Sequence, residues 1–141
     1  MINLTRISLD TNILIFGLLK IDPYAELLLQ NLFLFDVRIC EQVERELWNN
    51  FADWELKLFY EQAELLPSFS IVYQMPSKIL LKKYQMMGLK LGDAKIAAFC
   101  EEEDIDFFIT ENRHFLHHLT ERSFTIVDCK TFCDTFSLKQ D

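Results

Sequence analysis

Glycine is scarce in this chain, and the spread of the few glycines disfavours one class of protein. The three glycines, Gly17, Gly88 and Gly92, are isolated, and no G-x-x-x-x-G-K-[ST] segment occurs. A phosphate-binding loop needs clustered glycines, because backbone N–H groups approach a phosphate closely only where side chains are absent. The sequence therefore disfavours a nucleotide-binding enzyme of the Rossmann type. Ser8 stands outside any G-x-S-x-G segment, which disfavours a serine hydrolase.

Long hydrophobic runs are also missing. The longest apolar stretch, residues 27–35, is interrupted by Gln30 and Asn31, whereas a transmembrane helix needs about 20 predominantly apolar residues. The N-terminus has no basic flank followed by an uninterrupted apolar core, which is the pattern of a secretory signal. We therefore expect no membrane segment and a cytoplasmic location.

Cysteine is too scattered to form a disulfide framework. The four cysteines are Cys40, Cys100, Cys129 and Cys133, and a chain of this length can build a core without disulfides. We expect the thiols to be small buried groups. Cys129 and Cys133 can share one helix face, but no second pair of metal ligands accompanies them, so a zinc site is disfavoured.

Positive charge is the remaining deficit, since 14 Lys and Arg residues stand against 22 Asp and Glu residues and the formal net charge is −8. This balance argues against generic tight binding to nucleic acid, which relies on many contacts between phosphates and Lys or Arg. It does not exclude a nuclease, because several of the acids can serve as metal ligands. It also predicts a preference for a basic partner.

Apolar residues make up half of the chain, and its 13 phenylalanines add bulky core material, so we expect one globular domain over residues 1–141. The patterns predict strands at Thr5–Leu9, Asp36–Cys40, Ser68–Gln74, Phe107–Thr110 and Phe124–Val127, the third as an edge strand. They predict helices at Asn12–Leu19, Tyr24–Leu34, Glu41–Asn50, Asp53–Leu66, Ser77–Met87, Gly92–Glu103, Asn112–Leu119 and Lys130–Phe136. Alternating strands and helices indicate a mainly parallel sheet, so we expect a three-layer α/β/α sandwich around five strands.

Four polar residues stand where these strands end or these helices begin. Asp10 follows the first strand, Glu46 lies on the helix after the second, Asp93 opens the helix before the fourth, and Asn112 follows the fourth. In a parallel sheet such positions meet outside the carboxyl ends of the strands. Oxygen ligands suit Mg²⁺ or Mn²⁺, and such an ion can acidify a water for attack on phosphorus. The sequence therefore predicts a hydrolytic metal site.

Each of the four also has an ordinary structural explanation. Asp10 fits a turn or a cap, and Asn12 can cap the helix that follows. Asp93 and Asn112 fit helix caps, and Glu46 fits a solvated helix charge. Against this, Asp93 falls on the apolar stripe of its helix, and an ionised carboxylate that faces a core needs a partner or a metal. Only the joint placement of the four favours a site.

The segments ISLDTNILI, VEREL and GDAKIAAFCEEEDIDFFITENRHFL resemble the motifs of PIN-domain ribonucleases, which include the VapC-like toxins of toxin–antitoxin pairs. The resemblance covers nearly the whole chain, and it implies a five-stranded parallel sheet and Mg²⁺- or Mn²⁺-dependent cleavage of RNA. It assigns the family's metal-binding acids to Asp10, Glu46 and Asp93, and it favours Glu46 over Glu44. The family's fourth acid falls on Asn112, so a second metal would be held more weakly.

Polar residues near these positions carry further predictions. Arg113 offers a planar guanidinium to an RNA phosphate, and Asn12 and Thr110 offer polar groups in the same corner. Glu111 could partly replace the missing fourth acid, although its side chain should point to the opposite face of a continuing strand.

Two small basic clusters carry weaker predictions. They are His114, His117 and His118, and Lys78, Lys82 and Lys83. One histidine could act as a general acid or a zinc ligand, but a solvated or phosphate-facing helix edge is favoured. For the three lysines a solvated helix face is favoured.

These features together predict a Mg²⁺- or Mn²⁺-dependent endoribonuclease, acting as the toxin of a toxin–antitoxin pair. The alternative is a PIN-like domain that binds RNA or a protein partner without cutting, which Asn112 and the acidic composition favour. A phosphatase-like hydrolase is less favoured, because no nucleophile motif accompanies Asp10. We expect an antitoxin partner and a homodimer, whose interface the apolar helices near residues 27–35 and 56–66 could supply.

Overall fold

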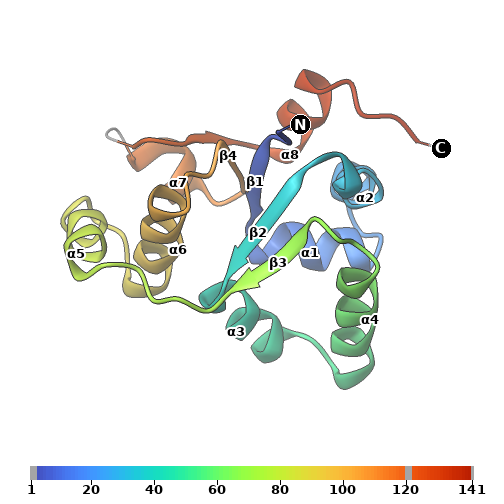
Figure 1. The fold of residues 1–141 in the computed structure, drawn as a ribbon, viewed down its shortest axis with the longest axis horizontal. Coiled ribbons are helices and arrows are strands. Elements are labelled where there is room, and N and C mark those ends of the chain that lie inside the picture. The colour runs from blue at the N-terminus through green and yellow to red at the C-terminus, as the bar shows by residue number, and fades with distance from the viewer. Residues whose placement is uncertain (1–2, 120–121, 141) are drawn as a thin grey trace.

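The computed structural model describes residues 3–119 and 122–140, which form a three-layer α/β/α sandwich (Figure 1). Its sheet has five strands in the order β3-β2-β1-β4-β5, and all neighbouring strands are parallel. The strands are β1 (Arg6–Leu9), β2 (Asp36–Cys40), β3 (Phe69–Val72), β4 (Phe107–Ile109) and β5 (Thr125–Val127). The predicted fold class is confirmed, and so is the edge position of the third strand.

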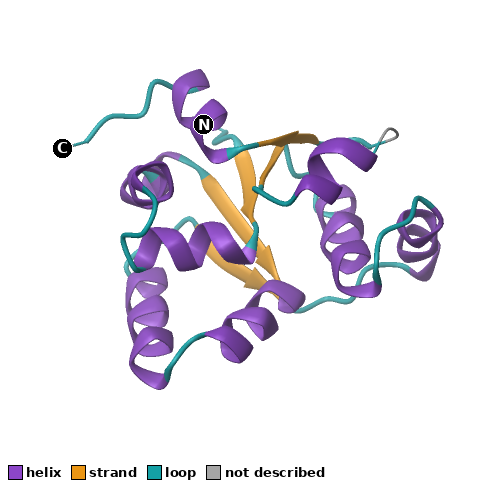
Figure 2. Ribbon diagram, turned by 180° about the vertical axis from the view of Figure 1, so that it is seen from behind, coloured by secondary structure: helices purple, strands orange, loops and turns teal. Residues whose placement is uncertain are grey.

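Helices cover both faces of the sheet, as the opposite views in Figures 1 and 2 show. They are α1 (Thr11–Leu18), α2 (Pro23–Gln30), α3 (Glu41–Asn50), α4 (Asp53–Glu64), α5 (Lys78–Met86), α6 (Leu91–Glu102), α7 (Arg113–His118) and α8 (Cys129–Thr135). α5 packs against α6 and lies outside it, at the left of Figure 1. No helix among the described residues is long and apolar enough to cross a membrane.

The central strands are buried because apolar residues run through them with little polar alternation. Ile7, Val37 and Phe108 are fully shielded from solvent, which is typical of parallel strands covered on both faces. The ladder pairs Leu9 of β1 with Ile109 of β4. These two strands therefore end side by side, and the residues after them emerge at the same edge of the sheet.

The predicted helix Tyr24–Leu34 is wrong after Gln30, because α2 ends there and a 3₁₀ turn follows at Leu32–Leu34. The cause is Asn31, which is buried. Its side-chain amide donates to the carbonyl oxygens of Leu27 (2.8 Å) and Lys139 (3.2 Å). These two bonds tie the end of the helix to the C-terminal segment.

Two helix starts also differ from the prediction. Asn12 does not cap α1; the cap is Asp10, whose carboxylate accepts the Thr11 N–H at 2.8 Å. α6 begins earlier than predicted, with Lys90 in the cap position. Asp93 therefore lies inside the first turn of α6 and is not its cap.

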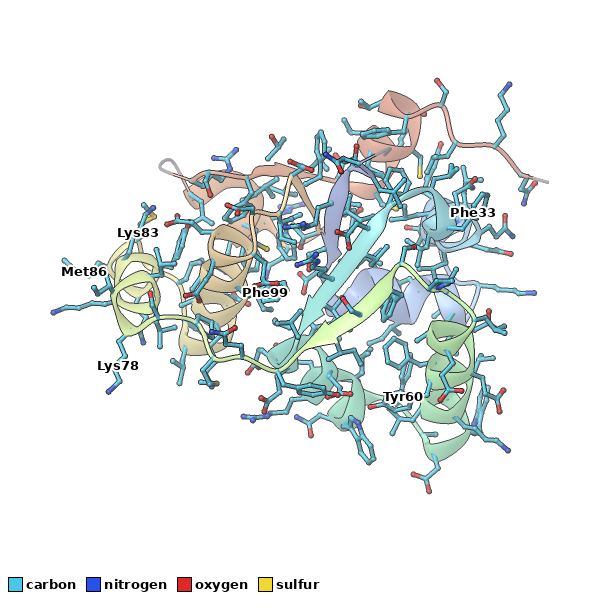
Figure 3. All side chains as sticks on the ribbon, viewed as in Figure 1. Phe33, Tyr60, Lys78, Lys83, Met86 and Phe99 are labelled. Atoms are coloured by element: carbon cyan, nitrogen blue, oxygen red, sulfur yellow. The ribbon has the colours of Figure 1, made fainter. Side chains whose placement is uncertain are left out.

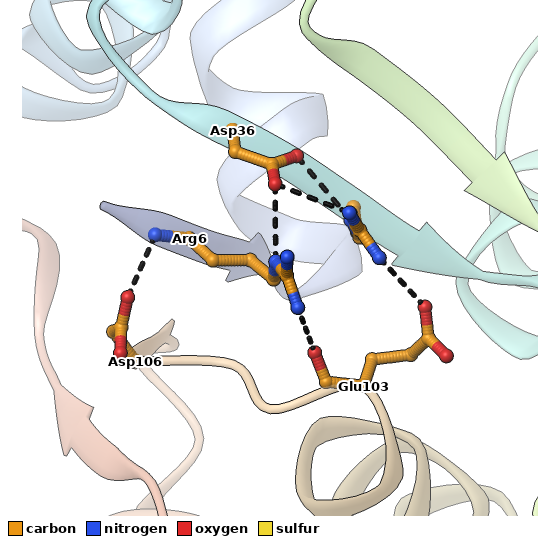
Figure 4. A network of polar contacts seen from close by, with 5 residues as sticks. Arg6, Asp36, Glu103 and Asp106 are labelled. Carbon is orange, nitrogen blue, oxygen red and sulfur yellow. Dashed lines mark hydrogen bonds and ion pairs between the residues drawn. The ribbon is translucent and has the colours of Figure 1, made fainter. Parts of the chain in front are cut away.

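A network of basic and acidic side chains closes the amino end of the sheet (Figure 4). The Arg6 guanidinium donates to Asp36 Oδ2 at 3.0 Å and to the Glu103 carbonyl oxygen at 2.7 Å. Arg38 contacts Asp36 and the Glu103 carboxylate at 3.3 and 3.1 Å, and the Arg6 N–H donates to Asp106 at 2.8 Å. These two arginines therefore join strand starts, at the end of the sheet opposite to the predicted site.

Candidate functional site

The predicted site lies where β1 and β4 end. Asp10 follows β1 directly, and its N–H donates to the carbonyl oxygen of Ile109 at 3.0 Å. Thr110 follows β4, and its hydroxyl donates to Asp10 Oδ2 at 2.6 Å. The other carboxylate oxygen, Oδ1, accepts the Thr11 N–H at 2.8 Å. Residues next to the strand ends therefore fix both oxygens of Asp10.

Asp10 is only 7% exposed, which is unusual for a charged side chain. Its pKa is raised from 3.8 to about 6, first because burial penalises the charged form. The hydrogen bonds from Thr110 and Thr11 lower the pKa, and the charges of Glu46 and Asp93 raise it. An acid in this position carries its charge at a cost in stability unless a cation lies beside it.

Glu46 reaches the same edge from α3. Its Oε1 accepts the Thr11 hydroxyl at 2.6 Å, and its Oε2 accepts the side-chain amide of Gln42, one helical turn earlier, at 2.9 Å. α6 passes close to this pair at Gly92, where an added Cβ would lie 3.2 Å from Gln42 Nε2. The missing side chain lets the start of α6, which carries Asp93, approach α3.

Asp93 is half-buried in the first turn of α6. Its pKa is raised by burial and then by the charge of Glu46, while the charges of His114 and Lys90 and a hydrogen bond from Asn112 lower it. The three acids therefore lie within electrostatic range of one another, although they come from three separate elements.

Asn112 is joined to the site in two ways. Its Oδ1 accepts the His114 N–H at 2.9 Å and so caps α7, and its own N–H donates to Thr110 Oγ1 at 2.9 Å. Its side chain also lies close enough to Asp93 to lower the pKa of that carboxyl group. An ionised carboxylate only accepts hydrogen bonds, so the amide NH₂ of Asn112 is the group that can stabilise its charge.

Two other acids weighed from the sequence lie elsewhere. Glu44 is two residues from Glu46 and so points to another side of α3, where it accepts the hydroxyls of Tyr60 on α4 and Tyr73 at 2.7 and 3.0 Å. Figure 3 shows the Tyr60 side chain extending from α4. Glu111 Oε1 accepts a backbone N–H at the start of α8 at 2.9 Å. The structure thus places Glu46, and neither of these acids, beside Asp10.

Of the remaining predicted residues, some contact the acids of the site and others do not. Thr110 belongs to it through the bond to Asp10. Asn12 and Arg113 are exposed at the starts of α1 and α7, and their contact with RNA stays a prediction. The side chains of His117 and His118 lie outside the part of the chain that the structure describes.

The sequence reasoning missed several residues that complete this corner. They are Thr11, Gln42, Gly92 and Lys90. Only Gln42 left a usable pattern, since it precedes Glu46 by one helical turn and shares its face. The others depend on how α1, α3 and α6 approach one another, which periodicity does not show.

The donor atoms of the site suit Mg²⁺ or Mn²⁺, which prefer carboxylate oxygens. Among the described residues, no three His, Cys, Asp or Glu side chains stand as a ready group for a metal ion. Hydrogen bonds within the protein use both oxygens of Asp10 and of Glu46. Mg²⁺ keeps several waters and is commonly held by one or two carboxylates, so an ion at this edge would not require a third protein ligand.

The model of the family described as PIN domain matches residues 7–118. A search of curated proteins found no match.

Solved structures share the fold at low sequence identity. VapBC2 from Rickettsia felis, bound to a DNA fragment from its promoter, is 18% identical over 87% of this chain and 98% of its own, with a TM-score of 0.61. PAE2754 from Pyrobaculum aerophilum is 17% identical over 94% of this chain and 90% of its own, with a TM-score of 0.60. VapBC-1 from nontypeable Haemophilus influenzae is 18% identical over 89% of this chain and 98% of its own, with a TM-score of 0.59.

Proposed function

This chain belongs to the PIN domain family, and from that premise we propose that it is a metal-dependent endoribonuclease acting as the toxin of a toxin–antitoxin pair. The observation that carries the proposal is the convergence of Asp10, Glu46 and Asp93 at the carboxyl edge of the sheet. Acids that raise one another's pKa destabilise a fold, and such groups cluster at functional sites. A bound cation would offset this cost.

The proposed ion is Mg²⁺ or Mn²⁺. Asp10 and Asp93 would hold it, Glu46 would be a further ligand or would position a water, and Asn112 would be a weaker ligand. Such an ion supplies an acidified water and stabilises charge on the leaving oxygen of a phosphodiester.

Neighbouring residues hold these donors in place before any substrate arrives. Thr110 Oγ1 and the Thr11 N–H fix the two oxygens of Asp10. The Thr11 hydroxyl and the Gln42 amide fix those of Glu46. Thr11 contacts both acids, and so couples the end of β1 to α3. Donors that are already oriented need little rearrangement in the transition state.

The toxin role and the partners are part of the same proposal. Two of the solved structures with this fold are VapBC proteins, and the net charge of −8 suits a basic protein partner. We propose one domain over residues 1–141, a homodimer, an antitoxin partner and a cytoplasmic location.

The rival proposal is a PIN-like domain that binds RNA or protein without cutting. It is favoured by Asn112, where an amide that caps α7 replaces a fourth acid. Titration with Mn²⁺ separates the two proposals, because failure to bind Mn²⁺ at millimolar concentration would favour the rival.

Cleavage of a labelled RNA tests the leading proposal. Wild-type protein should cut it with Mn²⁺ or Mg²⁺ and should stop in excess EDTA. Asp10→Asn removes one ligand charge and should lower the rate by on the order of 100-fold. Asp134→Asn makes the same change at an exposed position on α8 and should cut like wild type. Equal cleavage by wild type and Asp10→Asn would defeat the assignment.

A further inference from the structure

A hollow of about 150 Å³ lies directly beside the acids. Its lining residues are Gly88, Leu89, Lys90, Asp93 and His114. They come from the turn between α5 and α6, from the first turn of α6 and from α7. Asp93 is the wall that the hollow shares with the proposed metal site. A ligand in the hollow would therefore lie next to the phosphodiester that reacts at the proposed metal site.

The backbone fixes where Lys90 stands. α5 ends at a turn in which Gly88 has a φ of 101°, a conformation that residues with a Cβ rarely adopt. Leu89 is buried, and its N–H donates to the Tyr84 carbonyl oxygen at 3.3 Å. The exposed Lys90 follows directly as the cap residue of α6. The backbone position of Lys90 is thus set by a turn that is anchored in the core.

The ammonium group of Lys90 is not used by an ion pair of the described residues. The ion pairs of the described residues use Arg6, Arg38, Arg45 and Lys83, and Lys90 is in none of them. The charges of Lys90 and His114 both act on the Asp93 carboxylate. The lining of the hollow therefore combines one acidic residue, Asp93, which it shares with the proposed metal site, and two basic residues, Lys90 and His114.

The basic strip on α5 does not offer an equivalent site. Lys83 is held by Glu101 at 2.7 Å, and Lys78 extends away from the body of the protein (Figure 3). Neither of these two lysines lines the hollow, whereas Lys90 does.

An RNA strand needs such a group here. The protein carries a net charge of −8, so a polyanion is repelled by most of its surface and must be held by local positive charge. A lysine ammonium is a strong point-charge donor to phosphate. A phosphate in the hollow would add negative charge next to Asp93, and a cation bound at the acids would balance that charge.

We propose that the hollow formed by Lys90 and His114 binds the internucleotide phosphate next to the one that is cut, and so sets the register of the RNA strand across the acids. This inference rests on the proposed nuclease function of those acids. Lys90 is then a substrate-binding residue, and Asp93 separates the phosphate that is held from the phosphate that reacts.

The test measures binding and cleavage of one fluorescein-labelled single-stranded RNA over a series of salt concentrations. Lys90→Gln should weaken binding roughly tenfold, as loss of one charged hydrogen bond does. It should reduce the slope of log K against log salt by about 0.7, the value for one phosphate contact on a single strand. The KM should rise while kcat stays near wild type. Lys90→Arg should restore both binding and slope.

The matched control is Lys57→Gln, an equal charge change at an exposed position on α4. It should leave the salt slope unchanged. If Lys90→Gln and Lys57→Gln behave alike while wild type cuts RNA, the hollow does not bind phosphate and the nuclease assignment stands. If wild type neither binds nor cuts RNA, the proposed function fails and this inference fails with it.

Discussion

Asp10 combines a negative charge with an interior position. It is 7% exposed, and its pKa is about 6 instead of 3.8. Between these two pH values the folded protein binds a proton that the unfolded chain has released. The free energy of unfolding therefore falls as the pH rises through this window and levels off above it. A shift of this size corresponds to roughly 3 kcal/mol.

Asp10→Asn should remove this cost in metal-free protein. Asparagine keeps an oxygen for the Thr11 N–H and carries no charge. In EDTA at pH 7.5 we expect the variant to be more stable than wild type by about 2 kcal/mol. At pH 4 the difference should shrink toward zero. Urea denaturation at both pH values measures this, with Asp134→Asn as the control that changes neither. A variant less stable than wild type at pH 7.5 would refute the account of Asp10.

At the scale of the elements, the cap residue of α7, Asn112, connects this helix to the site. Asn112 Oδ1 accepts the His114 N–H at 2.9 Å, and the Asn112 side chain lowers the pKa of the nearby Asp93 carboxyl group. Aspartate is an equally good cap residue. The position can therefore carry a charge without loss of the helix start, but the charge would stand beside Asp93.

Asn112→Asp should therefore bind Mn²⁺ several-fold more tightly than wild type, and should be less stable in EDTA because of repulsion from Asp93. Calorimetric titration with Mn²⁺ measures the first effect. Asn49→Asp, an equal change at an exposed position on α3, should bind Mn²⁺ as wild type does. Unchanged affinity in Asn112→Asp would place residue 112 outside the metal site.

The order and type of the strands and helices were largely predictable, because strongly apolar runs alternate with amphipathic segments. The errors lie at element ends, where single polar side chains decide. Asn31 stopped α2 by bonding to Leu27 and Lys139, and the second of these partners lies 108 residues away. Asp10 displaced Asn12 as the cap of α1. Neither contact follows from local pattern.

The site was predictable only in part. Asp10 and Thr110 follow neighbouring strands of the sheet, so their meeting follows from topology alone. Glu46 and Glu44 lie on the same helix, and periodicity did not decide between them. The approach of α6 to α3 at Gly92 and the double contact of Thr11 with Asp10 and Glu46 require the packed structure.

Over the whole molecule, the two ends of the sheet differ in whether their acids form ion pairs. Arg6 and Arg38 are paired with acids at the amino end, whereas Asp10, Glu46 and Asp93 gather at the carboxyl end. The acidic end is thus the part of the fold that a divalent cation would stabilise most.

Divalent metal should consequently raise the melting temperature of the whole protein. At a Mn²⁺ concentration ten times the dissociation constant, linkage predicts about 1.4 kcal/mol of added stability, which is a shift of a few degrees for a chain of this size. Thermal unfolding followed by circular dichroism measures it. Asp10→Asn should lose the shift and Asp134→Asn should keep it. A shift retained in Asp10→Asn would mean that Mn²⁺ binds elsewhere.

The central claim is that Asp10 and Asp93 bind the same metal ion. A double-mutant cycle on RNA cleavage tests this claim most directly. Single-turnover rates are compared for wild type, Asp10→Asn, Asp93→Asn and the double variant at one Mn²⁺ concentration. Residues that act as a unit are strongly non-additive, so the double variant should be hardly slower than the slower single variant. Two losses that multiply, or a single variant that cuts at the wild-type rate, would contradict the account.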